Sequence, residues 1–289
     1  MIQNAFGRFI CEVTTTKAHY EDAVTKSDGV AKTLHSHYYD DPYSGTTKRL
    51  IGSYGKGTAL RPPRDVDILF LLPNEEYQRY KSYESNGPSQ LLQDVKSILQ
   101  DHYTTTDKMR GDGHVVVIPF EGYHTVELLP AWKTMSGKYI VPDTHDGGSW
   151  TLVDQTAEMV NVDGSNILTN GITRSLIRLL KAWQVECSVP IKSLVLELHA
   201  VTVLADGDPR EYEQSWSLLM KDVFEGLLQR VDHVELMPGT EAPFQFGNAW
   251  RSKAESAARR AARGLEFEVA GDNDSAILEW QKIFGKQYE

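Results

Sequence analysis

The sequence of 289 residues predicts an α+β fold in which a lobe built on a mixed β-sheet packs against a helical lobe. Two observations carry this prediction. Short runs rich in β-branched and aromatic residues lie between residues 49 and 132, and from about Thr169 to the end the apolar residues recur at helical spacing. We therefore expect one lobe at residues 1–150 and a second at residues 151–289.

The elements of the first lobe follow in order along the chain. Residues 1–48 contain few helix breakers before Asp40-Asp41-Pro42 and are predicted to be mainly helical. The apolar run Val66–Leu72 predicts a buried strand, and Ser89–His102 carries one apolar face of a helix. Three further segments are predicted: strands at Val115–Phe120 and Tyr123–Trp132 joined as a hairpin, and a long loop at Tyr139–Trp150, which contains Pro142, Gly147 and Gly148.

Composition narrows the class of protein. Cys11 and Cys187 are the only cysteines, which indicates neither a disulfide framework nor a zinc site. The net charge of −10 argues against binding of long nucleic acids and favours a small nucleotide as ligand. The apolar runs are too short to span a bilayer and the N-terminus has no signal-peptide pattern, so we expect a cytoplasmic enzyme without a membrane partner.

The candidate site begins at a glycine-rich turn that precedes two carboxylates. Asp65 and Asp67 are one residue apart at the start of a strand, so their side chains point to the same face and repel unless a cation lies between them. Carboxylates suit Mg²⁺, which proteins hold with one or two acids and the phosphates of a substrate. Gly52 and Ser53 can bring backbone N–H groups and a hydroxyl to those phosphates. Either feature alone is common on protein surfaces.

Together these residues form the pattern Gly-Ser-x3-Gly-Thr-x6-Asp-x-Asp, which resembles nucleotidyltransferases of the polymerase-β type. That superfamily needs a third acid from a later strand. The segment Val126-Glu127-Leu128-Leu129-Pro130-Ala131-Trp132 resembles the strand that carries it in the oligoadenylate-synthase and cGAS-like branch, with Glu127 where Asp is commoner. Glu121 is the competing acid, but in a hairpin turn it is more simply solvated.

The helical lobe extends the resemblance. The phrase Leu176-Ile-Arg-Leu-Leu-Lys-Ala-Trp183, followed by Ile191-Lys-Ser193, is similar to the helical core of bacterial cGAS/DncV-like nucleotidyltransferases, which implies that Lys181 and Ser193 hold the donor triphosphate. Asn166 or Asn170 could contact a base edge or mark a turn, and Tyr54 could stack on a base or pack against the sheet. His114 and His124 are interpreted as structural, and Arg259, Arg260 and Arg263 as a solvated face.

With the Trp-x3-Phe-Gly ending at Trp280–Gly285, the chain is identified as a member of the bacterial CD-NTase family, the signal-producing enzymes of CBASS antiphage systems. The resemblance implies two Mg²⁺ or Mn²⁺ ions held by Asp65, Asp67 and Glu127, and a reaction that joins ATP and a second NTP into a cyclic di- or trinucleotide. It also implies a downstream effector activated by that product and a regulatory partner protein. Two alternatives stay open: another polymerase-β-type transferase with a tRNA-end or small-molecule acceptor, and a catalytically silent nucleotide-binding module.

Overall fold

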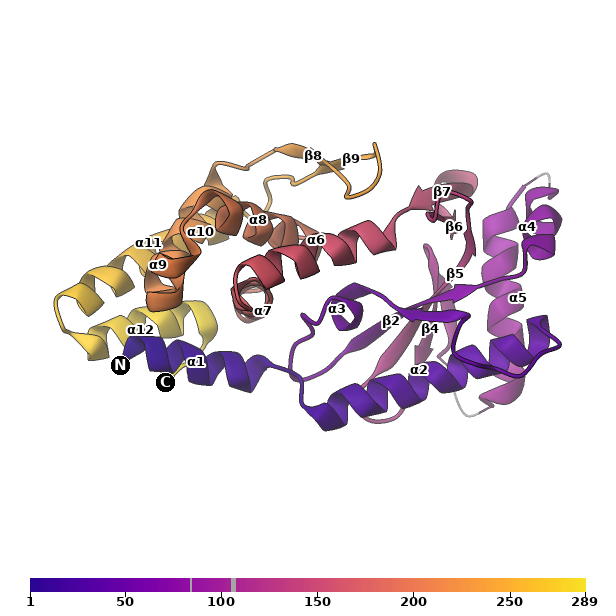
Figure 1. The fold of residues 1–289 in the computed structure, drawn as a ribbon, viewed down its shortest axis with the longest axis horizontal. Coiled ribbons are helices and arrows are strands. Elements are labelled where there is room, and N and C mark those ends of the chain that lie inside the picture. The colour runs from indigo at the N-terminus through magenta and orange to yellow at the C-terminus, as the bar shows by residue number, and fades with distance from the viewer. Residues whose placement is uncertain (84, 105–107) are drawn as a thin grey trace. The chain divides into compact units, whose positions relative to one another are not determined.

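The computed structural model describes residues 1–83, 85–104 and 108–289, which form two compact units (Figure 1). The sheet unit comprises residues 15–159 and 238–240, and the helical unit comprises residues 1–14, 160–237 and 241–289. Residues 1–14 therefore group with the C-terminal helices rather than with the segment that follows them. The division into lobes at residues 1–150 and 151–289 stays a prediction.

The sheet unit is built on a mixed sheet, which has seven strands among the described residues. The order β1-β2-β5-β4-β3 places β2 and β5 side by side in parallel, while β6 pairs with β5 and β7. The other pairs are antiparallel, including the predicted β4–β5 hairpin, and the α+β fold class is confirmed. The strands are β1 (Lys48–Leu50), β2 (Asp65–Leu71), β3 (Arg110–Asp112), β4 (Val115–Pro119), β5 (Thr125–Lys133), β6 (Tyr139–Asp143) and β7 (Ser149–Val153).

One face of this sheet is covered by helices α2 (Lys17–Tyr38) and α5 (Gly87–His102) (Figure 1). Strand alternation sends every second side chain of β2 and β5 into that core, among them Val66, Ile68 and Leu128. The opposite face carries a smaller apolar cluster and the acids of the candidate site. The helices predicted within residues 1–48 and near 89–102 are confirmed as α1 (Ile2–Val13), α2 and α5; α3 (Gly52–Gly55) and α4 (Asn74–Lys81) complete the sheet unit.

The loop predicted at Tyr139–Trp150 is wrong, because this segment forms the hairpin β6–β7 with the short 3-10 turn η1 (His145–Gly147) at its tip. Tyr139 and Val141 alternate into the apolar cluster on the sheet, and their burial outweighs the turn signal of the neighbouring residues. Gly147 and Gly148 have φ of +90° and +91°, so the glycines make the tip of a hairpin rather than a linker.

The helical unit holds most of the remaining helices. Helix α6 (Gln155–Leu168) begins in the sheet unit and ends in the helical unit. A prediction of helix from Thr169 to the end is wrong at the hairpin formed by β8 (Val234–Leu236) and β9 (Pro243–Gln245), whose short strands pair only with each other. The other helices are α7 (Ile172–Glu186), α8 (Ser193–Asp206), α9 (Pro209–Gln214), α10 (Trp216–Leu228), α11 (Arg251–Val269) and α12 (Asn273–Phe284).

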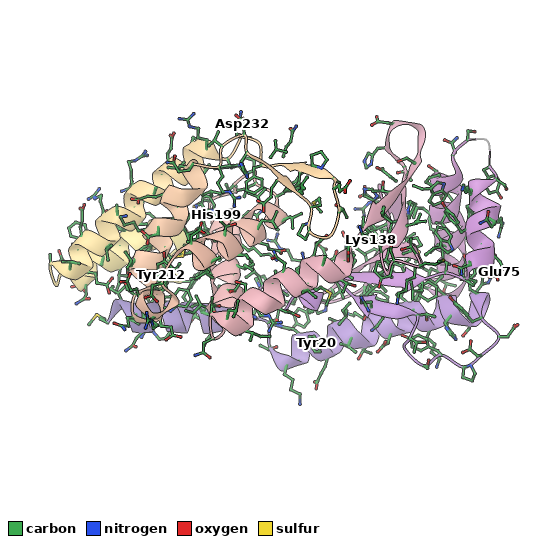
Figure 2. All side chains as sticks on the ribbon, turned by 45° about the horizontal axis from the view of Figure 1, so that its top comes forward. Tyr20, Glu75, Lys138, His199, Tyr212 and Asp232 are labelled. Atoms are coloured by element: carbon green, nitrogen blue, oxygen red, sulfur yellow. The ribbon has the colours of Figure 1, made fainter. Side chains whose placement is uncertain are left out.

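The core of the helical unit joins both ends of the chain. The ring of Phe6 on α1 lies 4.9 Å from Trp280 and 5.1 Å from Tyr288, measured between centroids. His199 on α8 is buried in the same unit (Figure 2), where its Nε2 donates to the carbonyl of Val223 at 2.7 Å. Burial lowers the pKa of His199 to about 4, so this imidazole is neutral at physiological pH.

The sequence predicts that the arginines of α11 form a solvated face, but two of them form ion pairs with a buried carboxylate. Arg260 and Arg263 approach the carboxylate of Glu279 at 3.1 and 3.3 Å, and that carboxylate is only 3% exposed. Lys282 joins them at 2.9 Å. A buried carboxylate needs such partners, so Arg260 and Arg263 tie α11 to α12, while Lys282 pairs with Glu279 within α12. Arg259 is exposed, as expected of a solvated position.

Candidate active site

The three predicted acids lie on neighbouring parallel strands of the sheet unit. In the register of β2 and β5, Asp65 pairs with Thr125 and Asp67 pairs with Glu127. Val66 and Val126, which alternate with the acids, point into the core below α2 and α5. Asp65, Asp67 and Glu127 therefore share the opposite face, and the in-register pair sits about 5 Å apart, the spacing of adjacent strands.

The glycine turn reaches the same acids from the side. Ile51 donates its N–H to the carbonyl of Asp67 at 3.0 Å, and Gly52 follows with φ of +56°. A Cβ at Gly52 would lie 1.9 Å from Oδ2 and 2.6 Å from Cγ of Asp67, so the carboxylate or the turn would have to move. Gly52 is thus required both for its backbone conformation and for the close approach of the turn to a carboxylate. Ser53 is the next residue of this turn. The structure therefore brings together the five site residues predicted in the sheet unit, which are Gly52, Ser53, Asp65, Asp67 and Glu127.

The acids on this face repel one another, and the pKa of Glu127 reflects this repulsion. Burial, together with the charges of Asp67 and Asp65, raises the pKa of Glu127 to about 7. Asp112 on β3 adds to the shift and Arg110 opposes it. A hard divalent cation would relieve this repulsion, and carboxylate oxygens on one face are the donor set that Mg²⁺ prefers. The residues present therefore fit the metal that the resemblance implies.

A buried chain of hydrogen bonds supports the glycine turn, and the sequence did not predict it. Tyr54 donates its phenol to Nε2 of His124 at 2.5 Å, and His124 donates from Nδ1 to Asp22 at 2.6 Å. Burial and the charge of Asp22 raise the pKa of Tyr54 to about 12, which keeps the phenol protonated as a donor. Burial opposes ionisation of Asp22, but hydrogen bonds from Lys26 and His124 lower its pKa overall.

These hydrogen bonds bear on two residues considered in the sequence: Tyr54, whose role was left open, and His124, which was interpreted as structural. The ring of Tyr54 belongs to the core of the sheet unit, so it packs against the sheet rather than stacking on a base. His124 is structural, as expected, yet it acts on the turn that carries Gly52 and Ser53. Lys56 is a second support of the turn, since it forms a buried ion pair with Glu158 at 2.9 Å. Only tertiary packing reveals these partners, because they are 70 to 102 residues apart in sequence.

The remaining predicted residues belong to the helical unit. Lys181 and Gln184 lie one turn apart on α7, and the amide oxygen of Gln184 accepts from the hydroxyl of Ser193 at 3.3 Å. Gln184 also donates to the carbonyl of Ile191 and so holds the start of α8 beside α7. The structure therefore brings Ser193 next to the face of α7 that carries Lys181.

Asn166 lies within α6, where its side-chain oxygen accepts from the backbone N–H of Arg174 at 3.0 Å. Arg174 is also paired with Asp163 at 2.7 Å, and burial together with the charge of Arg174 lowers the pKa of Arg178. Asn170 has φ of +50° and precedes Gly171 at +94°, so it marks the turn before α7. The side-chain oxygen of Asn166 therefore stabilises the start of α7. Its side-chain NH₂ group is the part that could donate to a base.

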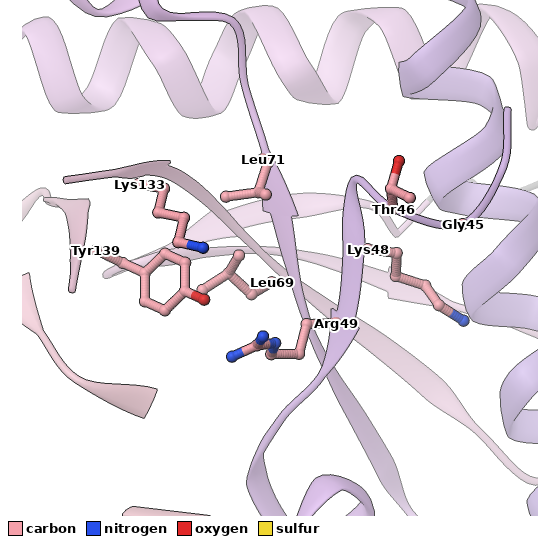
Figure 3. Close-up of a pocket in the computed structure, with 8 residues that line it drawn as sticks. All are labelled: Gly45, Thr46, Lys48, Arg49, Leu69, Leu71, Lys133 and Tyr139. Atoms are coloured by element: carbon pink, nitrogen blue, oxygen red, sulfur yellow. The ribbon is translucent and has the colours of Figure 1, made fainter. Parts of the chain in front are cut away.

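A hollow of about 180 Å³ lies farther along the acid-bearing face of β2 (Figure 3). Leu69, Leu71, Tyr139 and the cations Arg49 and Lys133 line it, together with Gly45, Thr46 and Lys48, whose ammonium group points away from the hollow. Lys48 is paired with Asp28 at 2.7 Å and Arg49 donates to Thr156 at 2.7 Å. None of the predicted site residues lines this hollow, so it is distinct from the carboxylate cluster.

A mixed sheet that carries Asp-x-Asp on one strand and a third acid in register on its parallel neighbour defines the class: a nucleotidyltransferase of the polymerase-β type. A family model described as the Second Messenger Oligonucleotide or Dinucleotide Synthetase domain matches residues 1–166, and the chain belongs to this family. It is therefore an enzyme, a nucleotidyltransferase that makes oligonucleotide or dinucleotide second messengers, and the recognition from sequence as a cGAS/DncV-like enzyme is confirmed.

Solved structures of CD-NTases share the fold. CdnC of E. coli MS115-1, in complex with HORMA-deltaN, aligns with a TM-score of 0.71 at 16% identity over 100% of this chain and 98% of that one. CdnG of Bradyrhizobium diazoefficiens, in complex with GTP, gives 0.70 at 13% identity over 99% and 96%. The cyclic AMP-GMP synthase DncV of Vibrio cholerae, bound to the linear intermediate pppA(3′,5′)pG, gives 0.68 at 12% identity over 97% and 93%.

A search of curated protein sequences gave no match. In the part of the chain that the structure describes, no helix has both the length and the apolar character needed to cross a membrane.

Proposed function

We propose that this enzyme is a metal-dependent synthase that joins NTPs into a cyclic di- or trinucleotide second messenger for antiphage signalling. The observation that carries the proposal is the pairing of Asp67 with Glu127 across parallel strands, with Gly52 pressed against Asp67. Asp65 completes the set. A module that only bound nucleotide would gain nothing from a half-buried Glu127 whose pKa is raised to about 7 by burial and by the charges of Asp67 and Asp65.

In this proposal Asp65, Asp67 and Glu127 hold two Mg²⁺ or Mn²⁺ ions. When bound, such ions would neutralise the donor triphosphate and lower the pKa of the acceptor hydroxyl. The chain's own contribution is to position these acids and the glycine turn. Gly52 and Ser53 donate backbone and hydroxyl hydrogens to the phosphates, and Tyr54 and His124 fix the turn from below.

The reaction needs no covalent nucleophile from the protein. A ribose hydroxyl of the acceptor loses its proton and its oxygen attacks the α-phosphorus of the donor NTP. The bond from that phosphorus to the bridging oxygen breaks, and pyrophosphate leaves. In a second transfer, the free hydroxyl of the linear intermediate attacks the α-phosphorus of its own triphosphate, a second pyrophosphate leaves, and the ring closes.

The helical unit contributes donor contacts in this proposal. Lys181 and Ser193 bind the triphosphate, which their placement on α7 and at the start of α8 supports, and the amide of Asn166 meets a base. We propose ATP and a second NTP as substrates. By analogy with CdnC, which was solved with HORMA-deltaN, a regulatory partner of that kind is proposed, with an effector that binds the cyclic product in the cytoplasm.

The test is mass spectrometry of products formed from mixed NTPs with Mg²⁺ or Mn²⁺, alone and with a candidate regulatory protein of the HORMA kind. We expect a phosphatase-resistant cyclic species. Glu127→Gln should abolish it, whereas Glu121→Gln, an exposed acid of the neighbouring hairpin turn, should retain it. Asp65→Asn with Asp67→Asn should also abolish product while the melting temperature stays equal or rises, because mutual repulsion is removed.

Other products would redirect the assignment. Nucleotidylated tRNA or small molecules, with no cyclic species under any activating condition, would contradict ring formation and leave a nucleotidyltransferase with another acceptor. Wild-type pyrophosphate release by the double Asp variant would show that these are not the catalytic acids.

A further inference from the structure

A second cluster of metal-ligating side chains lies in the sheet unit, outside the carboxylate site. His114, Asp143 and His145 each offer one ligand atom, and these atoms all lie within 4.8 Å of one another. His114 precedes β4, Asp143 ends β6, and His145 opens the turn η1. The two cysteines of the sequence indicate no cysteine-based zinc site. A site made of two histidines and one aspartate is independent of the number of cysteines.

The backbone holds the two turns that carry these residues together. Thr144 donates its N–H to the carbonyl of Gly113 at 3.1 Å, and His145 donates its N–H to Oδ1 of Asp143 at 3.0 Å. Gly113 has φ of +60°, and a Cβ there would lie 2.9 Å from Cε1 of His145. A glycine at this position lets the His145 ring come close to His114, and the two ring centroids are 6.0 Å apart.

The hydrogen bonds orient His114 as a metal ligand. Its Nδ1 is 2.7 Å from the carbonyl of Pro142, which can only accept, so Nδ1 carries the proton and Nε2 presents a lone pair. That Nε2 faces Oδ2 of Asp143 at 4.0 Å. A histidine that donates its other ring N–H to a backbone carbonyl is the usual arrangement behind a metal ligand.

The spacing and the chemistry favour one class of ion. With bonds of about 2.0–2.1 Å, neighbouring ligand atoms around tetrahedral Zn²⁺ are about 3.3 Å apart, so the Nε2 to Oδ2 distance needs to shorten by only some tenths of an ångström. The side chains of His114 and His145 are 43% and 67% exposed, and Nδ1 of His145 already lies 2.7 Å from Oδ1 of Asp143, so small side-chain rotations suffice to bring the ligand atoms around one ion. Two imidazoles with one carboxylate suit Zn²⁺, whereas Mg²⁺ prefers oxygen ligands alone.

The geometry points to a Zn²⁺ site formed by Oδ2 of Asp143, Nε2 of His114 and a ring nitrogen of His145, with water completing the coordination. The ion would link the start of β4 to the β6–β7 hairpin. Both β4 and β6 pair with β5, the strand that carries Glu127, so Zn²⁺ binding would brace two of the three strands that pair with it. This site does not depend on the proposed reaction.

The experiment uses the full chain with Asp65→Asn and Asp67→Asn, so that the carboxylate cluster cannot account for binding. Zn²⁺ is titrated into the metal-free protein in competition with a chromophoric chelator. We expect one equivalent to bind and to raise the melting temperature, with millimolar Mg²⁺ unable to displace it. His114→Ala and His145→Ala should each weaken binding by about a hundredfold or more, since changes outside the ligand shell alone cost about 10- to 100-fold.

His102→Ala is the matched control, because His102 is an exposed histidine of the same unit at the end of α5. It should bind Zn²⁺ like its parent. Co²⁺ gives an independent readout, a visible absorption band that appears in the parent and the control but not in the two ligand variants. The proposal is overturned if the parent binds less than one equivalent, if Mg²⁺ displaces the ion, or if the ligand variants bind as tightly as His102→Ala.

Discussion

Substituting Gly52 by alanine tests the geometry of the active site with a single methyl group. The added Cβ would lie 1.9 Å from Oδ2 of Asp67, whereas real Cβ atoms keep at least 3.0 Å, so the carboxylate and the turn must separate by 3.0 − 1.9 = 1.1 Å. A misplacement of about 1 Å in a catalytic group can lower turnover about 100-fold. We expect that loss in pyrophosphate release from NTPs.

The matched control is Gly137→Ala. Gly137 has φ of +85°, which is positive like the φ of +56° at Gly52 and likewise disfavours alanine. Nothing lies within 4 Å of the position that a Cβ would take at Gly137. Both variants pay about 1–2 kcal/mol for alanine in the left-handed region, which lowers the melting temperature by a few degrees. Only Gly52→Ala should also lose activity. Equal activity in the two variants would refute the inference that the turn must touch Asp67.

Three further outcomes follow from the structure. Lys181→Ala should weaken NTP binding about tenfold to hundredfold, the range of a charged hydrogen bond, while the exposed Arg259→Ala should not; equal effects would remove the assignment of Lys181. The folded-state pKa of His199 is about 4, below the unfolded value of about 6.5, so the unfolded chain binds the extra proton. Between pH 7 and pH 5 the free energy of unfolding, measured with denaturant, should therefore fall about 2 kcal/mol more than in His199→Gln; parallel curves would contradict this. Tyr54→Phe leaves Nε2 of buried His124 without its donor and should destabilise the chain by about 1–3 kcal/mol, also by denaturant unfolding, and an unchanged midpoint would contradict that role.

The carboxylate site could be predicted because its first part is local. Gly52, Asp65 and Asp67 are close in sequence. Because side chains alternate along a strand, their spacing alone predicts that the two acids share a face near the glycine turn. Glu127 was found as a charge that interrupts an apolar strand. The hairpin at residues 139–150 was not predicted because its glycines and proline are typical of a loop. It forms because Tyr139 and Val141 are buried against the sheet, a contact that the sequence does not reveal.

The supports of the site could not be predicted from sequence. Asp22 lies on α2, Tyr54 on α3 and His124 just before β5, and nothing in the sequence around each residue points to the other two. The same holds for Glu279, whose buried carboxylate turns Arg260 and Arg263 from solvated residues into ion-pair partners. Polar side chains find such partners only after packing has fixed their distances.

The register of β2 and β5 shows what holds the acids together. Two unit charges at the strand spacing of about 5 Å repel by about 3 kcal/mol at an effective dielectric constant of about 20. Against this, Val66 and Val126, and likewise Ile68 and Leu128, pair on the opposite face and are fully buried. Each such side chain contributes about 1.5–3 kcal/mol, so the four together outweigh the repulsion at least twofold. A slip of one residue would turn Glu127 into the core. The apolar face therefore fixes the acids in register before any metal binds, and a metal ion need only use a geometry that folding has already established.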